Sequence, residues 1–141
     1  MVGACKEDSS LDQSAHPRPA RTVIVVEDDA SLLSAMTFAL RADGFDVLGY
    51  SDGADLLTAS PRAETGCFVV DLRLPSLDGL SLIAALRERG ERAPAILITS
   101  NPEARHRQRA ARAGVTIVEK PLLDSELRLR IEEAMVRRPA G

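Results

Sequence analysis

The chain has 141 residues, 45% of them hydrophobic, which is enough for one globular domain of ordinary size with its own core. Its net charge of -3 is spread over residues of both signs and only 3% of residues are aromatic, which disfavours direct binding to nucleic acid. The sequence contains neither a signal peptide nor an apolar run of the ~20 residues that span a bilayer, so we expect a soluble protein without a membrane partner.

Residues 1–21 are mostly polar and lack hydrophobic periodicity, which predicts a disordered leader. We expect His16 in this leader to be solvated, because no second candidate metal ligand lies nearby. The two cysteines are Cys5 in the leader and Cys67 in an apolar segment, so they form neither a disulfide framework nor a metal-binding cluster. This use of cysteine fits the reducing cytoplasm, which is the location that we predict.

Five short segments are predicted to be β-strands, and helical spacing of apolar residues follows each of them. The first, third and fourth segments are apolar without alternation, which is typical of parallel strands buried on both faces. The strands are expected at residues 22–26, 45–50, 67–70, 94–99 and 115–119. The helices are expected over residues 32–40 with a left-handed cap at Gly44, around residues 56–57 before Pro61, and over residues 80–89, 102–113 and 124–138.

Strands and helices therefore alternate five times, at about 20 to 25 residues per unit, which predicts an α/β domain. Such a chain forms a parallel sheet with helices on both faces. The predicted domain covers residues 22–138, and residues 139–141 form a short tail. We therefore expect a single domain in this sequence.

Polar residues end four of the five predicted strands, namely Glu27 and Asp28, Asp71, Thr99 and Lys120. Because a parallel sheet brings the carboxyl ends of its strands to one edge, where ligands bind, these residues are expected to form one site. Clustered carboxylates repel one another by about 4 kcal/mol at an effective dielectric constant of 20, so they need a cation. Oxygen ligands favour Mg²⁺ over zinc, and a hydroxyl and an ammonium opposite the metal can hold a phosphoryl group. Taken alone, Asp71 could equally cap a turn.

Four motifs, in their order and spacing, resemble the response regulator receiver domain of two-component signalling. They are VVEDD at the first strand, DLRLPSLDG at the third, ITS at the fourth and EKP at the fifth. The resemblance covers Thr22 to about Arg137. It implies a flavodoxin-like (βα)5 doubly wound parallel sheet with the strand order 2-1-3-4-5. It also implies a phosphoprotein that acts in signal transduction through a phosphorelay.

The resemblance assigns Asp71 as the phosphoryl acceptor. It implies that Asp28, Asp71 and the backbone carbonyl of Arg73 bind Mg²⁺ directly, and that Glu27 does so directly or through water. Thr99 resembles the hydroxyl residue that binds a phosphoryl oxygen.

Further roles follow from the same resemblance. Lys120 corresponds to the ammonium that pairs with the phosphoryl group, and its bond to Pro121 is often cis in the family. We hypothesise that Arg73 and Asn101, two residues beyond Asp71 and Thr99, place the water that hydrolyses the phosphoryl group.

Two features depart from the family pattern or stay ambiguous. Ile117 occupies the position of an aromatic switch residue, and the alternative is that it is simply part of the core. A basic helix at residues 102–113 is either a solvated face or a docking surface for an acidic protein. Its cationic or potentially cationic residues are Arg105, His106, Arg107, Arg109 and Arg112.

We therefore interpret the chain as a stand-alone receiver, a switch rather than an enzyme, that takes a phosphoryl group from a sensor histidine kinase or a histidine phosphotransfer protein. A downstream protein partner is expected but not identified, and the oligomeric state is left open, a homodimer included. One alternative is a phosphorylation-independent interaction module, which Ile117 keeps open. The other is a small magnesium-dependent phosphohydrolase, which turnover of a generic phosphate ester would reveal.

Overall fold

The computed structural model describes residues 21–59, 64–122 and 125–137. The predicted leader lies outside these residues except for Arg21, and so do its His16 and Cys5. The tail, the helix stop at Pro61 and the helix start at Asp124 also lie outside them.

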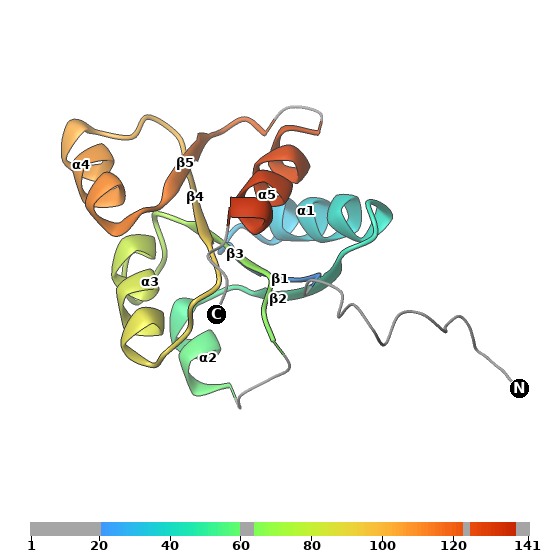
Figure 1. Ribbon diagram of the computed structural model, residues 1–141, viewed down its shortest axis with the longest axis horizontal. Coiled ribbons are helices and arrows are strands. Elements are labelled where there is room, and N and C mark those ends of the chain that lie inside the picture. Colours follow the sequence, from blue (N-terminus) through green and yellow to red (C-terminus); the bar gives the residue numbers. More distant parts are fainter. Residues whose placement is uncertain (1–20, 60–63, 123–124, 138–141) are drawn as a thin grey trace, which may run out of the picture.

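Five parallel strands form one sheet in the order β2-β1-β3-β4-β5, as the sequence predicts. The strands are β1 (Thr22–Val26), β2 (Asp46–Tyr50), β3 (Cys67–Asp71), β4 (Ala95–Thr99) and β5 (Thr116–Glu119). The helices are α1 (Ala30–Ala42), α2 (Gly53–Thr58), α3 (Gly79–Glu88), α4 (Ala104–Ala113) and α5 (Glu126–Arg137). Strands and helices alternate along the chain, so every crossover between parallel strands contains a helix (Figure 1).

The helices divide between the two faces of the sheet, and each face has its own core (Figure 1). Alternate residues of β1 point to opposite faces: Ile24 and Val26 join the core under α2, α3 and α4, whereas Val23 and Val25 join the core under α1 and α5. All four side chains are buried, which explains why β1 is apolar without alternation.

The helix ends follow local chemistry. Gly44 just after α1 and Gly114 at the end of α4 have φ values of +98° and +71°, the left-handed conformation that glycine adopts without strain. Helix α4 begins at Ala104 and not at the predicted Pro102. The difference arises because Asn101 has a φ of +49° and Glu103 is an extended N-cap residue, so the chain turns twice before the helix starts.

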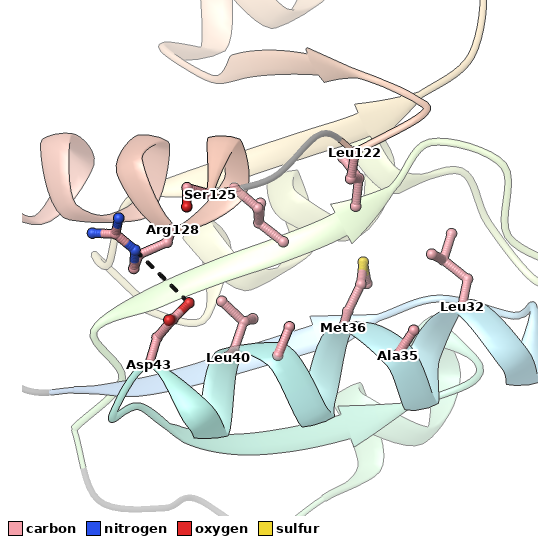
Figure 2. A pocket seen from close by; sticks show the side chains of 10 residues that line it. Leu32, Ala35, Met36, Leu40, Asp43, Leu122, Ser125 and Arg128 are labelled. Atoms are coloured by element: carbon pink, nitrogen blue, oxygen red, sulfur yellow. Dashed lines mark ion pairs between the residues drawn. The ribbon is translucent and has the colours of Figure 1, made fainter.

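The seam between α1 and α5 contains a cavity of about 270 Å³ (Figure 2). Apolar side chains such as Leu32, Met36 and Leu122 line it, and Arg128 Nε lies 3.9 Å from Asp43 Oδ2 at one end. Among the residues that the structure describes, no helix is both long and apolar enough to cross a bilayer.

Candidate functional site

Three consecutive acidic residues follow β1, and their carboxylates differ in burial and in hydrogen bonding. Glu27 is 1% exposed, and its carboxylate oxygen Oε2 accepts a hydrogen bond from the Asp29 N–H at 3.1 Å. Asp28 is exposed. Asp29 is the N-cap of α1, where its carboxylate accepts from the Leu32 N–H at 3.0 Å. Of the three acids, Glu27 and Asp28 join Asp71 in the carboxylate cluster, whereas Asp29 caps the helix.

Asp71 is the last residue of β3 and only 4% exposed, in the middle of the sheet edge. Its carboxylate has a partner on each oxygen. Oδ1 accepts from the Arg73 N–H at 3.3 Å, and Oδ2 lies 3.3 Å from the Lys120 ammonium nitrogen Nζ. These contacts fix the orientation of a carboxylate that has little access to solvent.

Lys120 joins the two buried carboxylates, since its Nζ lies 3.1 Å from Glu27 Oε1 and 3.3 Å from Asp71 Oδ2. Burial is the largest cause that raises the pKa of Glu27, and the neighbouring Asp71 raises it further. Burial alone would lower the pKa of Lys120, but its contacts with Glu27 and Asp71 outweigh burial and raise that pKa above the usual lysine range. One ammonium thus compensates two carboxylates, which leaves a net negative site.

The site has the donor set that a hard divalent cation needs. Carboxylate oxygens of Glu27, Asp28 and Asp71 lie within 4.8 Å of one another. Glu27 Oε1 is buried, and among the described residues it has its ion-pair partner but no hydrogen bond of good geometry. All-oxygen ligands with excess negative charge fit Mg²⁺ and do not fit zinc, which prefers nitrogen and sulfur.

An open cavity of about 330 Å³ joins these carboxylates to the other strand ends. Thr99 at the end of β4 and Ser100 just after it line the cavity. Thr99 is 1% exposed, and its hydroxyl donates to the Ser100 carbonyl at 3.2 Å. The full lining is Glu27, Asp28, Asp29, Asp71, Arg73, Thr99, Ser100 and Lys120. Asn101, assigned to water placement by resemblance, is not among the lining residues.

The response regulator receiver domain model matches residues 23–132. The chain belongs to the response regulator receiver domain family. The receiver is 32% identical over 114 residues to the transcriptional regulatory protein FixJ of Bradyrhizobium diazoefficiens, with 80% of this chain and 56% of FixJ covered. It is 31% identical over 117 residues to the transcriptional regulatory protein PrrA of Mycobacterium tuberculosis, with 82% of this chain and 50% of PrrA covered. The chain spans about half the length of the curated relatives it matches.

Solved structures agree with this assignment. The crystal structure of FixJ-N superposes with a TM-score of 0.75 at 29% identity and covers 85% of this chain and 97% of that chain. The CheY-like receiver domain of Methanospirillum hungatei superposes with a TM-score of 0.77 at 18% identity and covers 84% of this chain and 95% of that chain. At this identity the likeness supports only the assignment of the fold.

Ile117 is the residue that the resemblance assigns to the aromatic switch position. Ile117 in β5 is opposite Leu97 of β4, is half-buried, and packs against the core under α2, α3 and α4. It therefore contributes to packing, and it carries no polar group that could form a hydrogen bond in one state and lose it in another.

The cationic residues of α4 do not form one uniform face. His106 is buried and its Nδ1 accepts from the Glu103 N–H at 3.1 Å, as part of a capping box. Three arginines form ion pairs, Arg105 with Glu103 at 2.9 Å, Arg107 with Glu119 at 2.8 Å and Arg109 with Asp78 at 3.2 Å. Arg105 and Arg107 are exposed, Arg109 is half-buried, and all three are paired with acids of the same chain, which favours the solvated-face interpretation.

Gly79 is a functional position that sequence analysis missed. It opens α3, and a Cβ atom there would overlap the Asp71 carbonyl oxygen and lie 2.9 Å from Leu97 Cδ1. The glycine allows the loop after Asp71 to return directly to the sheet, with the Gly79 N–H donating to the Leu72 carbonyl at 2.8 Å. The only sequence signal was the Asp-Gly pair that closes the DLRLPSLDG motif.

We expect Gly79→Ala to destabilise the receiver by roughly 2 kcal/mol. Alanine in a helix is normally favoured over glycine by up to about 1 kcal/mol, but here the added methyl group meets backbone that cannot give way, and overpacking costs more. Urea unfolding followed by circular dichroism measures the change. Ser34→Ala, at an exposed position in α1, is the control and should change stability much less. A Gly79→Ala variant as stable as the wild type would contradict the close approach.

Proposed function

We propose that this receiver accepts a phosphoryl group on Asp71 from a phosphohistidine and that the modified receiver changes its binding to a downstream protein. The donor is a sensor histidine kinase or a histidine phosphotransfer protein, which the receiver meets in the cytoplasm. The observation that carries the proposal is the position of the Asp71 carboxylate, held between the Arg73 N–H and the Lys120 ammonium at the base of an open cavity.

The transfer uses few protein groups. A carboxylate oxygen of Asp71 attacks phosphorus in line, the new P–O bond forms as the P–N bond breaks, and the electron pair returns to the imidazole of the donor. Lys120, which already contacts Asp71, remains close enough to pair with a phosphoryl oxygen. Thr99 needs only to turn its hydroxyl from the Ser100 carbonyl toward the cavity to bind another oxygen.

The acidic cluster would hold Mg²⁺ through Asp28, Asp71 and the backbone carbonyl of Arg73. Glu27 would act through water, because Oε2 is already an acceptor for the Asp29 N–H and Oε1 pairs with Lys120. Bound Mg²⁺ supplies charge neutralisation for the carboxylates and the phosphoryl oxygens.

Intact mass spectrometry after incubation with acetyl phosphate tests the proposal. The receiver should gain one phosphoryl group with Mg²⁺ and none when EDTA removes the metal. Absence of any gain in folded, magnesium-bound protein would favour the phosphorylation-independent module. Sustained turnover of a generic phosphate ester would instead favour the phosphohydrolase, although Asp71 would serve as nucleophile in both cases.

Arg73 and Asn101 are proposed to tune loss of the phosphoryl group. Arg73 lines the cavity, whereas Asn101 does not line it and lies two residues beyond Thr99, which does. We expect Arg73→Ala and Asn101→Ala to change the half-life of the phosphorylated receiver by roughly threefold or more, on the scale of one lost hydrogen bond. The decay of the phosphorylated mass measures this change. Unchanged half-lives in both variants would contradict a role of Arg73 and Asn101 in loss of the phosphoryl group.

A further inference from the structure

The loop between β3 and α3, residues 72–78, presents backbone groups to the site. Its ends are fixed, since the Leu72 N–H donates to the Ile98 carbonyl at 2.9 Å and the Gly79 N–H donates to the Leu72 carbonyl at 2.8 Å. Near its start, the Arg73 N–H donates to Asp71 Oδ1 at 3.3 Å. The position of this loop therefore decides how the acceptor carboxylate is oriented and where the Arg73 carbonyl lies.

The middle of the loop is bound to the first turn of α2. The Ser76 hydroxyl oxygen lies 2.6 and 2.8 Å from the two carboxylate oxygens of Asp52, a residue 24 positions earlier in the chain. Asp52 is also the N-cap of α2, where it accepts from the Ala54 N–H at 3.2 Å. The hydrogen bond from Ser76 is the largest cause that lowers the pKa of Asp52, so this carboxylate stays ionised at neutral pH and the hydrogen bond is charge-assisted.

A second contact, of different chemistry, lies beside the first. A Cβ atom on Gly53 would lie 3.0 Å from Leu77 Cδ2 and 3.1 Å from Leu82 Cδ2, so Leu77 packs closely on the first residue of α2. Leu74 and Leu77 are also packed against the core on this face of the sheet. Two neighbouring loop residues thus contact two neighbouring α2 residues, one through a hydrogen bond and one through apolar packing.

We propose that Asp52 and Ser76 form a clamp that positions the β3–α3 loop for metal binding and phosphoryl acceptance at Asp71, an inference that rests on the proposed function. Both are positioning residues, because neither is among the residues that line the cavity. Without the clamp the loop keeps its fixed ends and its leucines, but the Arg73 backbone gains freedom. The Arg73 carbonyl then ligates the metal less well, and the Arg73 N–H orients Asp71 less well.

The decisive variant is Ser76→Ala, which removes the hydroxyl that donates to Asp52 and leaves Asp52 as the N-cap of α2. We expect it to raise the Mg²⁺ dissociation constant, measured by isothermal titration calorimetry, roughly fivefold. Phosphorylation by acetyl phosphate should need more Mg²⁺, and its maximal rate at saturating Mg²⁺ should be lower than in the wild type, because the Arg73 N–H orients Asp71 less well. Ser76→Thr retains the hydroxyl and should restore the affinity. Ser34→Ala, at an exposed position in α1, is the matched control and should leave it unchanged.

A measurement without metal separates the clamp from the proposed function. In metal-free protein, the Arg73 amide should exchange with deuterium roughly fivefold faster in Ser76→Ala than in the wild type, with the Leu40 amide in α1 as an internal reference. If the Arg73 amide of Ser76→Ala exchanged at the wild-type rate and the variant bound Mg²⁺ with the wild-type affinity, the clamp proposal would be wrong. If the wild type itself neither binds Mg²⁺ nor gains a phosphoryl group, the proposed function fails, and the exchange of Arg73 alone decides whether the clamp orders the loop.

Discussion

Asp71→Asn is expected to gain no phosphoryl group from acetyl phosphate under conditions in which the wild type gains one. The amide oxygen that replaces the carboxylate is neutral and a poor nucleophile, while the Arg73 N–H can still donate to it. Intact mass spectrometry gives the result directly, as the presence or absence of one added phosphoryl group per chain. If Asp71→Asn gained a phosphoryl group, the acceptor would have to be a residue other than Asp71.

The same variant should be at least as stable as the wild type. The charge of Asp71 raises the pKa of the buried Glu27, so its removal relieves a repulsion and leaves Glu27 as the one buried carboxylate that Lys120 compensates. Thermal unfolding tests this, and it separates a lost nucleophile from a lost fold. Asp55→Asn, at an exposed position in α2, is the control that should gain the phosphoryl group as the wild type does.

Lys120→Met should lower both phosphorylation and stability. The variant loses the only ammonium in contact with Glu27 and Asp71 among the described residues, and an uncompensated buried charge costs roughly 3 kcal/mol. Because the pKa of Glu27 is already raised in the folded state, ionisation of Glu27 opposes folding as the pH rises above the usual glutamate range. Removal of Lys120 increases this effect, so the loss of stability should be larger at pH 8 than at pH 5.

The wild type should show a different loss of stability at high pH. The pKa of Lys120 is raised in the folded state, so its contribution is fully present below the usual lysine pKa and is lost as the pH rises through the folded value. Thermal unfolding at pH 5 and pH 8 follows the effect of Glu27. Thermal unfolding at pH 10 and pH 12, on either side of the usual lysine pKa, follows the effect of Lys120. Arg112→Met, which removes an exposed cation from α4, is the control. Equal melting temperatures of Lys120→Met and Arg112→Met at pH 8 would contradict the pairing of Lys120 with the buried carboxylates.

Addition of Mg²⁺ should recover part of the stability that Lys120→Met loses at pH 8. A divalent cation among the carboxylates of Glu27, Asp28 and Asp71 would neutralise the charge that the ammonium no longer compensates. The shift in melting temperature on adding Mg²⁺ should therefore be larger in this variant than in Arg112→Met.

The strand order could be predicted because four motifs resemble the receiver family, which implies that order. The gathering of polar residues at one sheet edge could be predicted from the residues themselves, because polar residues end four of the five expected parallel strands. β1 ends at Val26 and β4 at Thr99, as expected, since in each case apolar residues stop where polar ones begin. Element starts were less accurate. Pro94 and Val115 were predicted to open strands that begin one residue later, because the hydrogen bonds of the sheet and not hydrophobicity decide where pairing starts.

The environments of individual charges could not be predicted. Glu27 and Asp28 are adjacent acids, and only the structure shows that one is buried and the other exposed. The Asp52–Ser76 contact joins two polar residues in separate loops. The periodicity of apolar residues, from which the elements were predicted, gives no information about such a contact. The ion pairs of α4 could not be predicted either, because the counter-charges Asp78 and Glu119 come from outside the helix.

The two separate cores suggest how this receiver can change in evolution. The sheet lies between the core under α1 and α5 and the core under α2, α3 and α4, and the β3–α3 loop packs only against the latter. Substitutions in sites that share no contacts add nearly independently. The surface of α1 and α5 can therefore diversify while the β3–α3 loop stays unchanged, so new recognition properties can arise in this chain without altering the proposed phosphoryl acceptor site.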